Sequence, residues 1–172
     1  GERVRLWSAA CSSGEEPYSV ALTLLDAIPH ALRCDIKILA TDIDPNVVAR
    51  GRDGAYREEA VSPIPPAIRD RWMTRERDGG ESFWHIKDEV KSLIAFKELN
   101  LIGNWPMRGQ FDIIFCRNVV IYFEEDTQAF LWKRFKDILT PDGRLFIGHS
   151  ERIEVSGFES AGLTIYKLTG AP

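Results

Sequence analysis

The sequence is poor in the residues that build metal centres and disulfide frameworks. Its 172 residues include three cysteines and three histidines. Cys11, Cys34 and Cys116 are odd in number and far apart, and the histidines show no ligand spacing with them or with one another. Zinc sites need several such ligands at short spacings, and disulfide scaffolds use paired cysteines. We therefore expect no metal site, and reduced thiols in a cytoplasmic protein.

Long hydrophobic runs and a surplus of basic residues are also missing. No apolar stretch approaches the ~20 residues of a membrane-spanning helix, and the first residues do not resemble a signal peptide. The formal net charge of −4 disfavours a nucleic-acid partner, whose phosphates attract basic surfaces. The composition, 44% hydrophobic and 28% charged, is ordinary for a soluble globular protein, and the length fits a single domain over residues 1–172.

What the sequence does contain is a regular alternation of strand and helix patterns. Strands are expected at residues 3–10, 35–41, 92–99, 111–116 and 144–148. Helices are expected at residues 17–27, 45–52 and 127–139, the last ending at the turn sequence TPDG. This order predicts an α/β fold with a mostly parallel, doubly wound sheet. The tail at residues 158–168 predicts one or two closing antiparallel strands.

Residues 56–90 interrupt the alternation and predict an inserted unit. SPIPPAIRDRW favours a short helix, RERDGGE a polar turn and SFWHIKDEVKS a strand, so we expect an antiparallel hairpin. Four aromatic residues are expected to form a small satellite core, with an exposed patch for a partner as the alternative. They are Trp72, Phe83, Trp84 and Phe96.

The loop after the first strand, in WSAACSSGEEPYSVAL, has the strand–loop–helix order of a dinucleotide fold but unusual chemistry. It holds one glycine, Gly14, followed by the carboxylates Glu15 and Glu16. Those charges would repel a pyrophosphate at the helix N-terminus, whereas they tolerate a cationic ligand. We expect Glu15 to face the ligand and Glu16 to complement the helix dipole.

The next two strand ends carry candidate nucleoside contacts. Asp42 closes the second strand, where a carboxylate can accept both ribose hydroxyls, while Asp44 is better explained as a helix N-cap. Asn100 and Leu101 follow the third strand and could read an adenine edge and pack on its face. The alternative for Asn100 is ordinary turn chemistry.

The fourth strand ends abruptly in Arg117 and Asn118, between the apolar runs of FDIIFCRNVVIYF. Polar groups wedged between apolar runs are costly to bury, so both are expected to face the cleft. Arg117 could pair with a carboxylate of a substrate or ligand, or form a structural salt bridge. A ligand with adenine, ribose and a cation but no phosphate is S-adenosylmethionine, and the pattern favours it over NAD.

At these residues the chain closely resembles the catalytic domain of CheR-type chemotaxis receptor methyltransferases. The resemblance runs in order through RLWSAACSSGEEPYSVAL, ILATDIDPNVV, FKELNL, FDIIFCRNVVIYF and LTPDGRLFIGHSE, across residues 5–151. It implies a class I S-adenosylmethionine-dependent methyltransferase fold, with a Rossmann-like sheet whose last strands are antiparallel. It also implies that residues 56–90 are the family's small antiparallel β-subdomain.

The resemblance implies methyl transfer from S-adenosylmethionine to glutamate side chains on the cytoplasmic helices of chemoreceptors. S-adenosylhomocysteine is the implied product, and a receptor C-terminal peptide is an implied partner of the β-subdomain. Arg117 and Tyr122 are the implied catalytic residues, with Tyr122 as a wall near the transferred methyl. The implied cofactor contacts are Glu15, Asp42, Asn100, Leu101, Arg117 and Asn118.

The resemblance leaves alternatives. The chain starts at Gly1, just before the first strand, so we expect the family's helical N-terminal domain and its Asn-x-Thr-x-Phe-Phe-Arg segment to be absent. A chain without that domain could be a signalling module that binds S-adenosylmethionine without turnover. A methyltransferase acting on small molecules or nucleic acid is a further alternative. The Cys-Arg-Asn segment disfavours it, because amino-methylating enzymes usually place an Asn/Asp-Pro-Pro-aromatic motif there.

Overall fold

The computed structural model describes residues 3–78 and 80–170. Its large sheet has seven strands in the order β6-β2-β1-β7-β8-β10-β9. They are β1 (Val4–Ala9), β2 (Ile36–Asp42), β6 (Ile94–Glu98), β7 (Phe111–Cys116), β8 (Leu139–Ile147), β9 (Phe158–Gly162) and β10 (Ile165–Leu168). A separate three-stranded antiparallel sheet has the order β3-β5-β4, from β3 (Ala55–Arg57), β4 (Met73–Asp78) and β5 (Glu81–Ile86).

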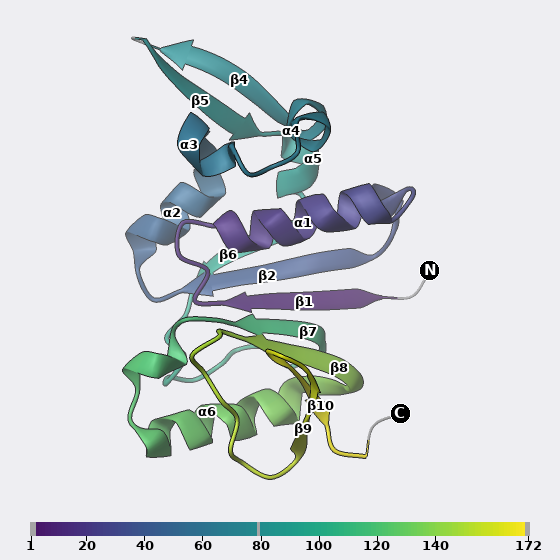
Figure 1. The fold of residues 1–172 in the computed structure, drawn as a ribbon, viewed down its shortest axis with the longest axis vertical. Coiled ribbons are helices and arrows are strands. Elements are labelled where there is room, and N and C mark those ends of the chain that lie inside the picture. The colour runs from purple at the N-terminus through teal and green to yellow at the C-terminus, as the bar shows by residue number, and fades with distance from the viewer. Residues whose placement is uncertain (1–2, 79, 171–172) are drawn as a thin grey trace.

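The helices connect these strands. The longest two are α1 (Glu15–Ala27) and α6 (Glu125–Ile138). The shorter ones are α2 (Pro45–Asp53), α3 (Glu58–Val61), α4 (Pro66–Trp72), α5 (Asp88–Lys91) and the 3₁₀ turns η1 (Ala31–Arg33) and η2 (Val120–Tyr122). Figure 1 shows the small sheet beyond α1 at one end of the molecule, with α6 and the β9–β10 hairpin at the other.

The pairing of the strands confirms the predicted fold class. β1 pairs in parallel with β2 and β7, β2 with β6, and β7 with β8. β10 is antiparallel to both of its neighbours, β8 and β9, so β9 runs in the same direction as β8. The carboxyl ends of β1, β2, β6 and β7 therefore meet along one edge, where an open α/β sheet binds its ligands.

Two hydrophobic clusters cover opposite faces of the sheet. Adjacent residues of β1 point to opposite sides, since side chains alternate along a strand. Leu6 belongs to the cluster that contains the buried side chains of α1, and Trp7 to the cluster that contains Trp132 and Phe135 of α6. The core of this protein is therefore a three-layer α/β/α arrangement.

Local sequence explains where α2 begins. The side chain of Asp44 accepts a hydrogen bond from the backbone N–H of Asn46 at 2.8 Å, and Pro45 occupies the first turn. This is the N-cap that the sequence predicted for Asp44. Gly54 ends the helix in the left-handed conformation.

The start of β8 differs from the prediction. The strand begins at Leu139, directly after α6, so TPDG lies inside it rather than before it. The pairing with β7 jumps from Phe111↔Leu139 to Ile113↔Arg144, so four residues on β8 oppose one on β7. This irregularity accommodates Pro141 and Gly143 within a strand, which is why turn residues gave a wrong strand start.

The inserted segment also departs from its predicted boundaries. Residues 75–78, expected in a polar turn, continue β4 and pair with β5. Residue 79, which was predicted in the same polar turn, lies outside the described residues. Residues 88–91, expected in a strand, form α5, whose first turn carries Asp88 and Glu89. Acidic residues at a helix N-terminus stabilise it, and this local effect overrides the β-rich pattern.

Three of the four aromatic residues that were predicted to cluster here are core residues rather than an exposed patch. Trp72, Trp84 and Phe96 are buried in the same cluster as α1 and β2, so the prediction of a separate satellite core was wrong. Phe83 stays half-exposed, with the guanidinium of Arg57 5.6 Å from its ring centre. The small sheet is thus packed onto the large one through a continuous core.

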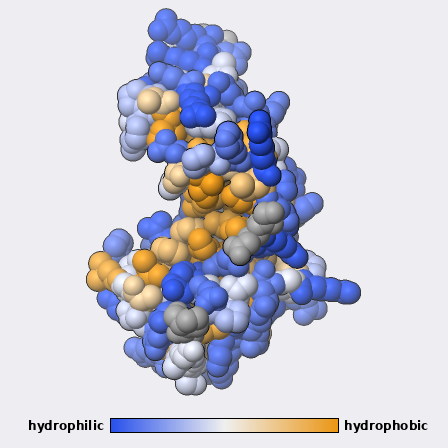
Figure 2. All heavy atoms as spheres, turned by 90° about the vertical axis from the view of Figure 1, so that its right-hand side faces the viewer, coloured by the Kyte–Doolittle hydropathy of each residue, from blue (hydrophilic) through white to orange (hydrophobic). Residues whose placement is uncertain are grey.

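The large sheet is not covered everywhere. In Figure 2, hydrophobic side chains reach the surface across the middle of the molecule. A groove of about 410 Å³ beside α1 has apolar lining from α1, β1 and β7, including Val20, Leu24, Ile113 and Phe115. Within residues 3–78 and 80–170, no helix has the length and apolar character needed to span a membrane.

Candidate functional site

The loop between β1 and α1 is held in an unusual backbone conformation. Ala10, Ser12 and Gly14 have φ of 60°, 49° and 95°. These values lie in the left-handed region, which is unfavourable for residues other than glycine. Asp42, at the end of β2, accepts hydrogen bonds from the backbone N–H of Ser12 at 2.9 Å and of Asp44 at 3.1 Å. Strained backbone is characteristic of ligand-binding loops, and here a carboxylate of the neighbouring strand stabilises it.

A second strained loop follows β7. Asn118 has φ of 59°. Its backbone N–H and those of Val119 and Val120 donate to the carboxylate of Glu151, at 3.1, 3.0 and 2.8 Å. Glu151 follows β8 and is 4% exposed. Both loops at this edge of the sheet are therefore organised by a carboxylate from a neighbouring strand end.

A cavity of about 290 Å³ lies between these loops. It contains three of the residues predicted to contact the cofactor, Asp42, Asn100 and Leu101. The rest of its lining is apolar: Ala10, Ile43, Leu99, Ile102, Val119 and Phe123. One carboxylate and one amide in an apolar pocket suit a nucleoside, because the carboxylate can accept ribose hydroxyls while the base packs on aliphatic side chains.

Asn100 combines turn chemistry with a free end. Its side-chain oxygen accepts a hydrogen bond from the backbone N–H of Ile102 at 3.0 Å, as in an Asx turn. The amide nitrogen carries two further donors that can meet a base edge. Leu101 is 6% exposed, and its carbonyl oxygen accepts from Arg134 and from the indole of Trp105. The two readings of Asn100, turn residue and adenine contact, are therefore compatible.

Arg117 lies outside this cavity and pairs with an acid of the first helix. Its guanidinium is 3.4 Å from the carboxylate of Glu16, which also accepts a hydrogen bond from the hydroxyl of Ser8 at 2.6 Å. The Arg117 side chain is 42% exposed, so solvent screens the pair and it contributes little stability. Glu16 thus ties α1 to β1 and β7, a role beyond the helix-dipole contribution predicted for it.

The remaining predicted residues lie outside this cavity and are exposed. Glu15 is exposed and accepts hydrogen bonds from the hydroxyl of Ser13 at 2.8 and 2.9 Å. Asn118 is also exposed, on the second strained loop. Tyr122, in η2, is 79% exposed. The geometry thus brings Asp42, Asn100 and Leu101 together in one cavity but not Glu15, Asn118 or Tyr122, and Glu15 lines a separate cavity with Tyr18 and Tyr56.

The thiols near the site are buried and protonated. Burial, followed by the charge of Asp42, raises the pKa of Cys11 to about 12. Burial, followed by the charge of Glu151, raises the pKa of Cys116 well above its usual value. A nucleophilic cysteine needs a lowered pKa, so neither thiol is suited to covalent catalysis. Within the described residues, no group of histidine, cysteine and acidic side chains is arranged to hold a metal ion.

The small sheet supports the first loop directly. The hydroxyl of Tyr56, in β3, donates to the carbonyl oxygen of Ser13 at 2.7 Å. Burial raises the pKa of Tyr56 well above its ordinary value, so it remains a donor. A Cβ at Gly14 would lie 3.0 Å from this hydroxyl, which leaves no room for another residue.

Sequence reasoning missed Glu151 and the apolar cavity wall. Glu151 stands within GHSE, four residues after the end of β8, and local pattern gives an acid there no special meaning. Its sequence signals are that it closes the segment LTPDGRLFIGHSE of the family resemblance and that this segment follows a strand at the carboxyl edge, but neither signal assigns the acid a contact. Val119 and Phe123 belong to an apolar run that resembled an ordinary core segment.

Comparison with known proteins now identifies the family. The sequence model of the CheR methyltransferase SAM-binding domain matches residues 1–166. The chain belongs to the CheR methyltransferase family. The matched part is the family's SAM-binding domain, so the cofactor is S-adenosylmethionine. This agrees with the prediction from the acidic loop, whose glutamates would repel a phosphate ligand.

Curated relatives agree over nearly the whole chain. A probable chemotaxis protein methyltransferase of Rhizobium etli is 49% identical over an alignment that covers 98% of this chain and 64% of the relative. The chemotaxis protein methyltransferase of Escherichia coli is 40% identical over 96% of this chain and 58% of the length of that relative. The chain therefore spans about three fifths of the length of these relatives.

Solved structures support the fold. The carbon methyltransferase DszA superposes with a TM-score of 0.53 at 17% identity, over 86% of this chain and 29% of that one. PKMT2 from Rickettsia typhi, solved with AdoHcy, superposes with a TM-score of 0.52 at 15% identity, over 84% of this chain and 20% of that one. At such identities the likeness establishes the shared α/β fold alone.

Proposed function

We propose that this chain is the catalytic part of a chemotaxis protein-glutamate O-methyltransferase. The observation that carries the proposal is the cavity of Asp42, Asn100 and Leu101 between two strained loops, in a chain of the CheR family. The relatives are named chemotaxis protein methyltransferases, and the identity reaches 49%. Residues 56–90 are proposed as the family's inserted subdomain within a single catalytic domain.

The proposed chemistry needs few catalytic groups. S-adenosylmethionine supplies an activated methyl on a positively charged sulfur. A glutamate carboxylate is already ionised at neutral pH, so no general base is required. The residues have to align the accepting oxygen with the methyl and exclude water. The protonated state of Cys11 and Cys116 is consistent with such a site.

Each side chain has a proposed role. Asp42 accepts the ribose hydroxyls, while Asn100 and Leu101 contact the adenine. Glu15 and Asn118, which are both exposed, meet the charged end of the cofactor. Arg117, which pairs with Glu16, orients a carboxylate of the substrate or cofactor. Tyr122 forms a wall near the transferred methyl group. Its exposure on η2 supports contact with a macromolecule at this edge.

The proposed substrates are glutamates on the cytoplasmic helices of methyl-accepting chemoreceptors. A receptor C-terminal peptide is proposed to dock on the small sheet. In support, β4 is an edge strand of that sheet, and an edge strand can pair with an extended peptide through its backbone.

The test joins binding to transfer. Calorimetric titration with S-adenosylhomocysteine should give saturable binding, and labelled methyl from S-adenosylmethionine should appear on receptor-enriched membranes as base-labile ester. Receptors with glutamine in place of the accepting glutamates serve as the control and should remain unlabelled. Binding without transfer, in a protein extended to the length of its relatives, would contradict the proposal and favour a cofactor-binding module.

A further inference from the structure

Glu151 makes a set of contacts that the proposed chemistry does not use. One oxygen of its carboxylate accepts from the backbone N–H of Val119 and Val120, and the other from those of Asn118 and Gly148. The distances are 2.5 to 3.1 Å. Each oxygen thus accepts two hydrogen bonds, and the side chain is almost completely buried. Such a carboxylate has little capacity left for a ligand.

The contacts fix a loop that is unfavourable by itself. Asn118 is in the left-handed region, and three successive N–H groups, of residues 118–120, converge on one point. Converging backbone N–H groups form a concave site for an anion and are costly to leave unpaired. The protein supplies that anion from the segment after β8.

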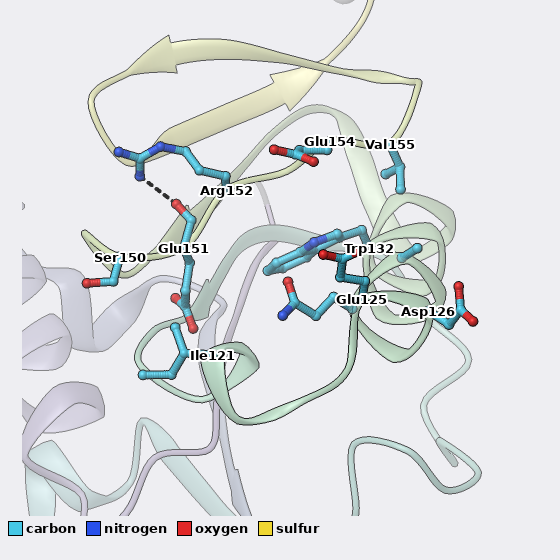
Figure 3. A pocket seen from close by; sticks show the side chains of 11 residues that line it. Ile121, Glu125, Asp126, Trp132, Ser150, Glu151, Arg152, Glu154 and Val155 are labelled. Atoms are coloured by element: carbon cyan, nitrogen blue, oxygen red, sulfur yellow. Dashed lines mark hydrogen bonds between the residues drawn. The ribbon is translucent and has the colours of Figure 1, made fainter.

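The segment that carries Glu151 is itself closed into a turn. The backbone N–H of Glu151 donates to the carbonyl of Gly148 at 3.1 Å, and the guanidinium of Arg152 donates to the carbonyls of His149 and Glu151 at 2.9 and 2.6 Å. Figure 3 shows the Glu151 side chain directed from this segment toward the turn that carries Ile121. The backbone of the segment that carries the Glu151 carboxylate is therefore also fixed by hydrogen bonds.

Gly148 makes the close approach possible. A Cβ at this position would lie 2.5 Å from the side-chain oxygen of Asn118 and 2.8 Å from the Glu151 carboxylate. Both distances are too short for a side chain, so the end of β8 can meet the loop only as glycine.

The loop held in this way forms one wall of the nucleoside cavity. Val119 lines that cavity, and its backbone N–H donates to Glu151. We propose that Glu151 is a positioning residue, which acts through the loop of residues 117–120 to set the wall of the S-adenosylmethionine cavity. The inference rests on the proposed function only for the identity of the cavity's ligand.

The first experiment needs no cofactor. In hydrogen exchange of the wild-type protein, the amides of residues 118–120 should be protected. Glu151→Gln keeps the shape but turns a donor toward them, and their exchange should quicken at least 30-fold. Glu154 is an exposed carboxylate in the same segment, so Glu154→Gln is the matched control. It should leave the exchange of the amides of residues 118–120 unchanged. Unchanged exchange in Glu151→Gln overturns the proposal, whatever the protein methylates.

The second experiment measures the cavity. Glu151→Gln should weaken S-adenosylhomocysteine binding at least tenfold by calorimetry and raise KM for S-adenosylmethionine at least tenfold, with kcat reduced less than threefold. A merely structural role would lower the melting temperature and leave the Kd of the folded protein within twofold, which overturns the proposal. This Kd does not depend on the protein substrate, so it stands if methyl transfer fails.

A second variant keeps the test decisive if Glu151→Gln does not fold. Gly148→Ala keeps Glu151 in the sequence, but its Cβ crowds both the Glu151 carboxylate and the side chain of Asn118. It should weaken S-adenosylhomocysteine binding at least fivefold and quicken exchange of the same three amides. Wild-type affinity in folded Gly148→Ala would contradict the claim that this loop sets the cavity wall.

Discussion

The two loops beside the cavity of Asp42, Asn100 and Leu101 are both held by a carboxylate, but the two carboxylates differ in their remaining capacity for a ligand. In the loop of residues 10–14 and in that of residues 117–120, a residue other than glycine is left-handed and a carboxylate from the neighbouring strand end binds the backbone N–H groups. Asp42 binds one N–H with each oxygen and lines the cavity. Glu151 binds two with each and is buried. One carboxylate keeps capacity for a ligand, and the other is committed to the loop.

The comparison extends to the thiols behind the loops. Cys11 lies in the first loop and Cys116 ends the strand before the second, and both have raised pKa values. In each case burial is the larger cause, and the loop's own carboxylate, Asp42 or Glu151, is the charge that adds to it. Each loop thus combines a buried neutral thiol with a charged acceptor of backbone hydrogen bonds.

The largest effect is expected when Asp42 is removed. Asp42→Ala deletes the acceptor proposed for the ribose and the anchor of Ser12 together, so the free energy of cofactor binding should weaken by about 3 kcal/mol, or roughly 100-fold in Kd. Asp42→Asn keeps one side-chain oxygen, so its Kd should lie between those of the wild type and Asp42→Ala. Calorimetry with S-adenosylhomocysteine measures both, and a change below threefold in Asp42→Ala would contradict a ligand role for this carboxylate.

A smaller effect is expected at the exposed ion pair between the two loops. Arg117→Ala should lower kcat/KM, with a loss of transition-state stabilisation of about 1.5 kcal/mol or more, if the guanidinium holds a carboxylate in the transition state. Glu16→Gln removes only the half-exposed pair and should cost less than about 1 kcal/mol. Steady-state kinetics on receptor membranes compare the two variants. Equal losses would reduce Arg117 to a structural partner of Glu16.

The smallest effect is expected from Cys11 and appears only in alkali. Its pKa is about 12 in the folded protein and near 9.0 when unfolded, so the folded state keeps a proton that the unfolded state loses. The stability from this group is complete below pH 9 and declines as pH rises toward 12, by about 1 kcal/mol at pH 10. Denaturant unfolding of wild type and Cys11→Ser should show a shallower alkaline decline in the variant.

The exposed thiol provides the control for that measurement. Cys34→Ser should leave the alkaline decline unchanged, because Cys34 is exposed. An identical pH slope in Cys11→Ser and wild type would show that the first loop opens and hydrates its thiol in the folded state.

Much of the fold was predictable because its signals are local. Short apolar runs bounded by turns placed β1, β2, β6 and β7, and Asp44 with Pro45 placed the start of α2. Two predictions failed because tertiary contacts override local chemistry. The turn residues TPDG are taken into β8 as an irregularity, and the tryptophans of the insert join the core beneath α1 instead of forming their own.

Local sequence was enough to establish the α/β order, the family and the acidic loop that disfavours a phosphate ligand. It also pointed to Asp42, because a carboxylate that directly ends a strand must lie at the binding edge of a parallel sheet. The contact of Arg117 with Glu16 and the hydrogen bonds of Glu151 to residues 118–120 could be found only in the folded chain. Those partners are separated by 101 and by 31 to 33 residues, and no local periodicity encodes a contact made by packing strands side by side.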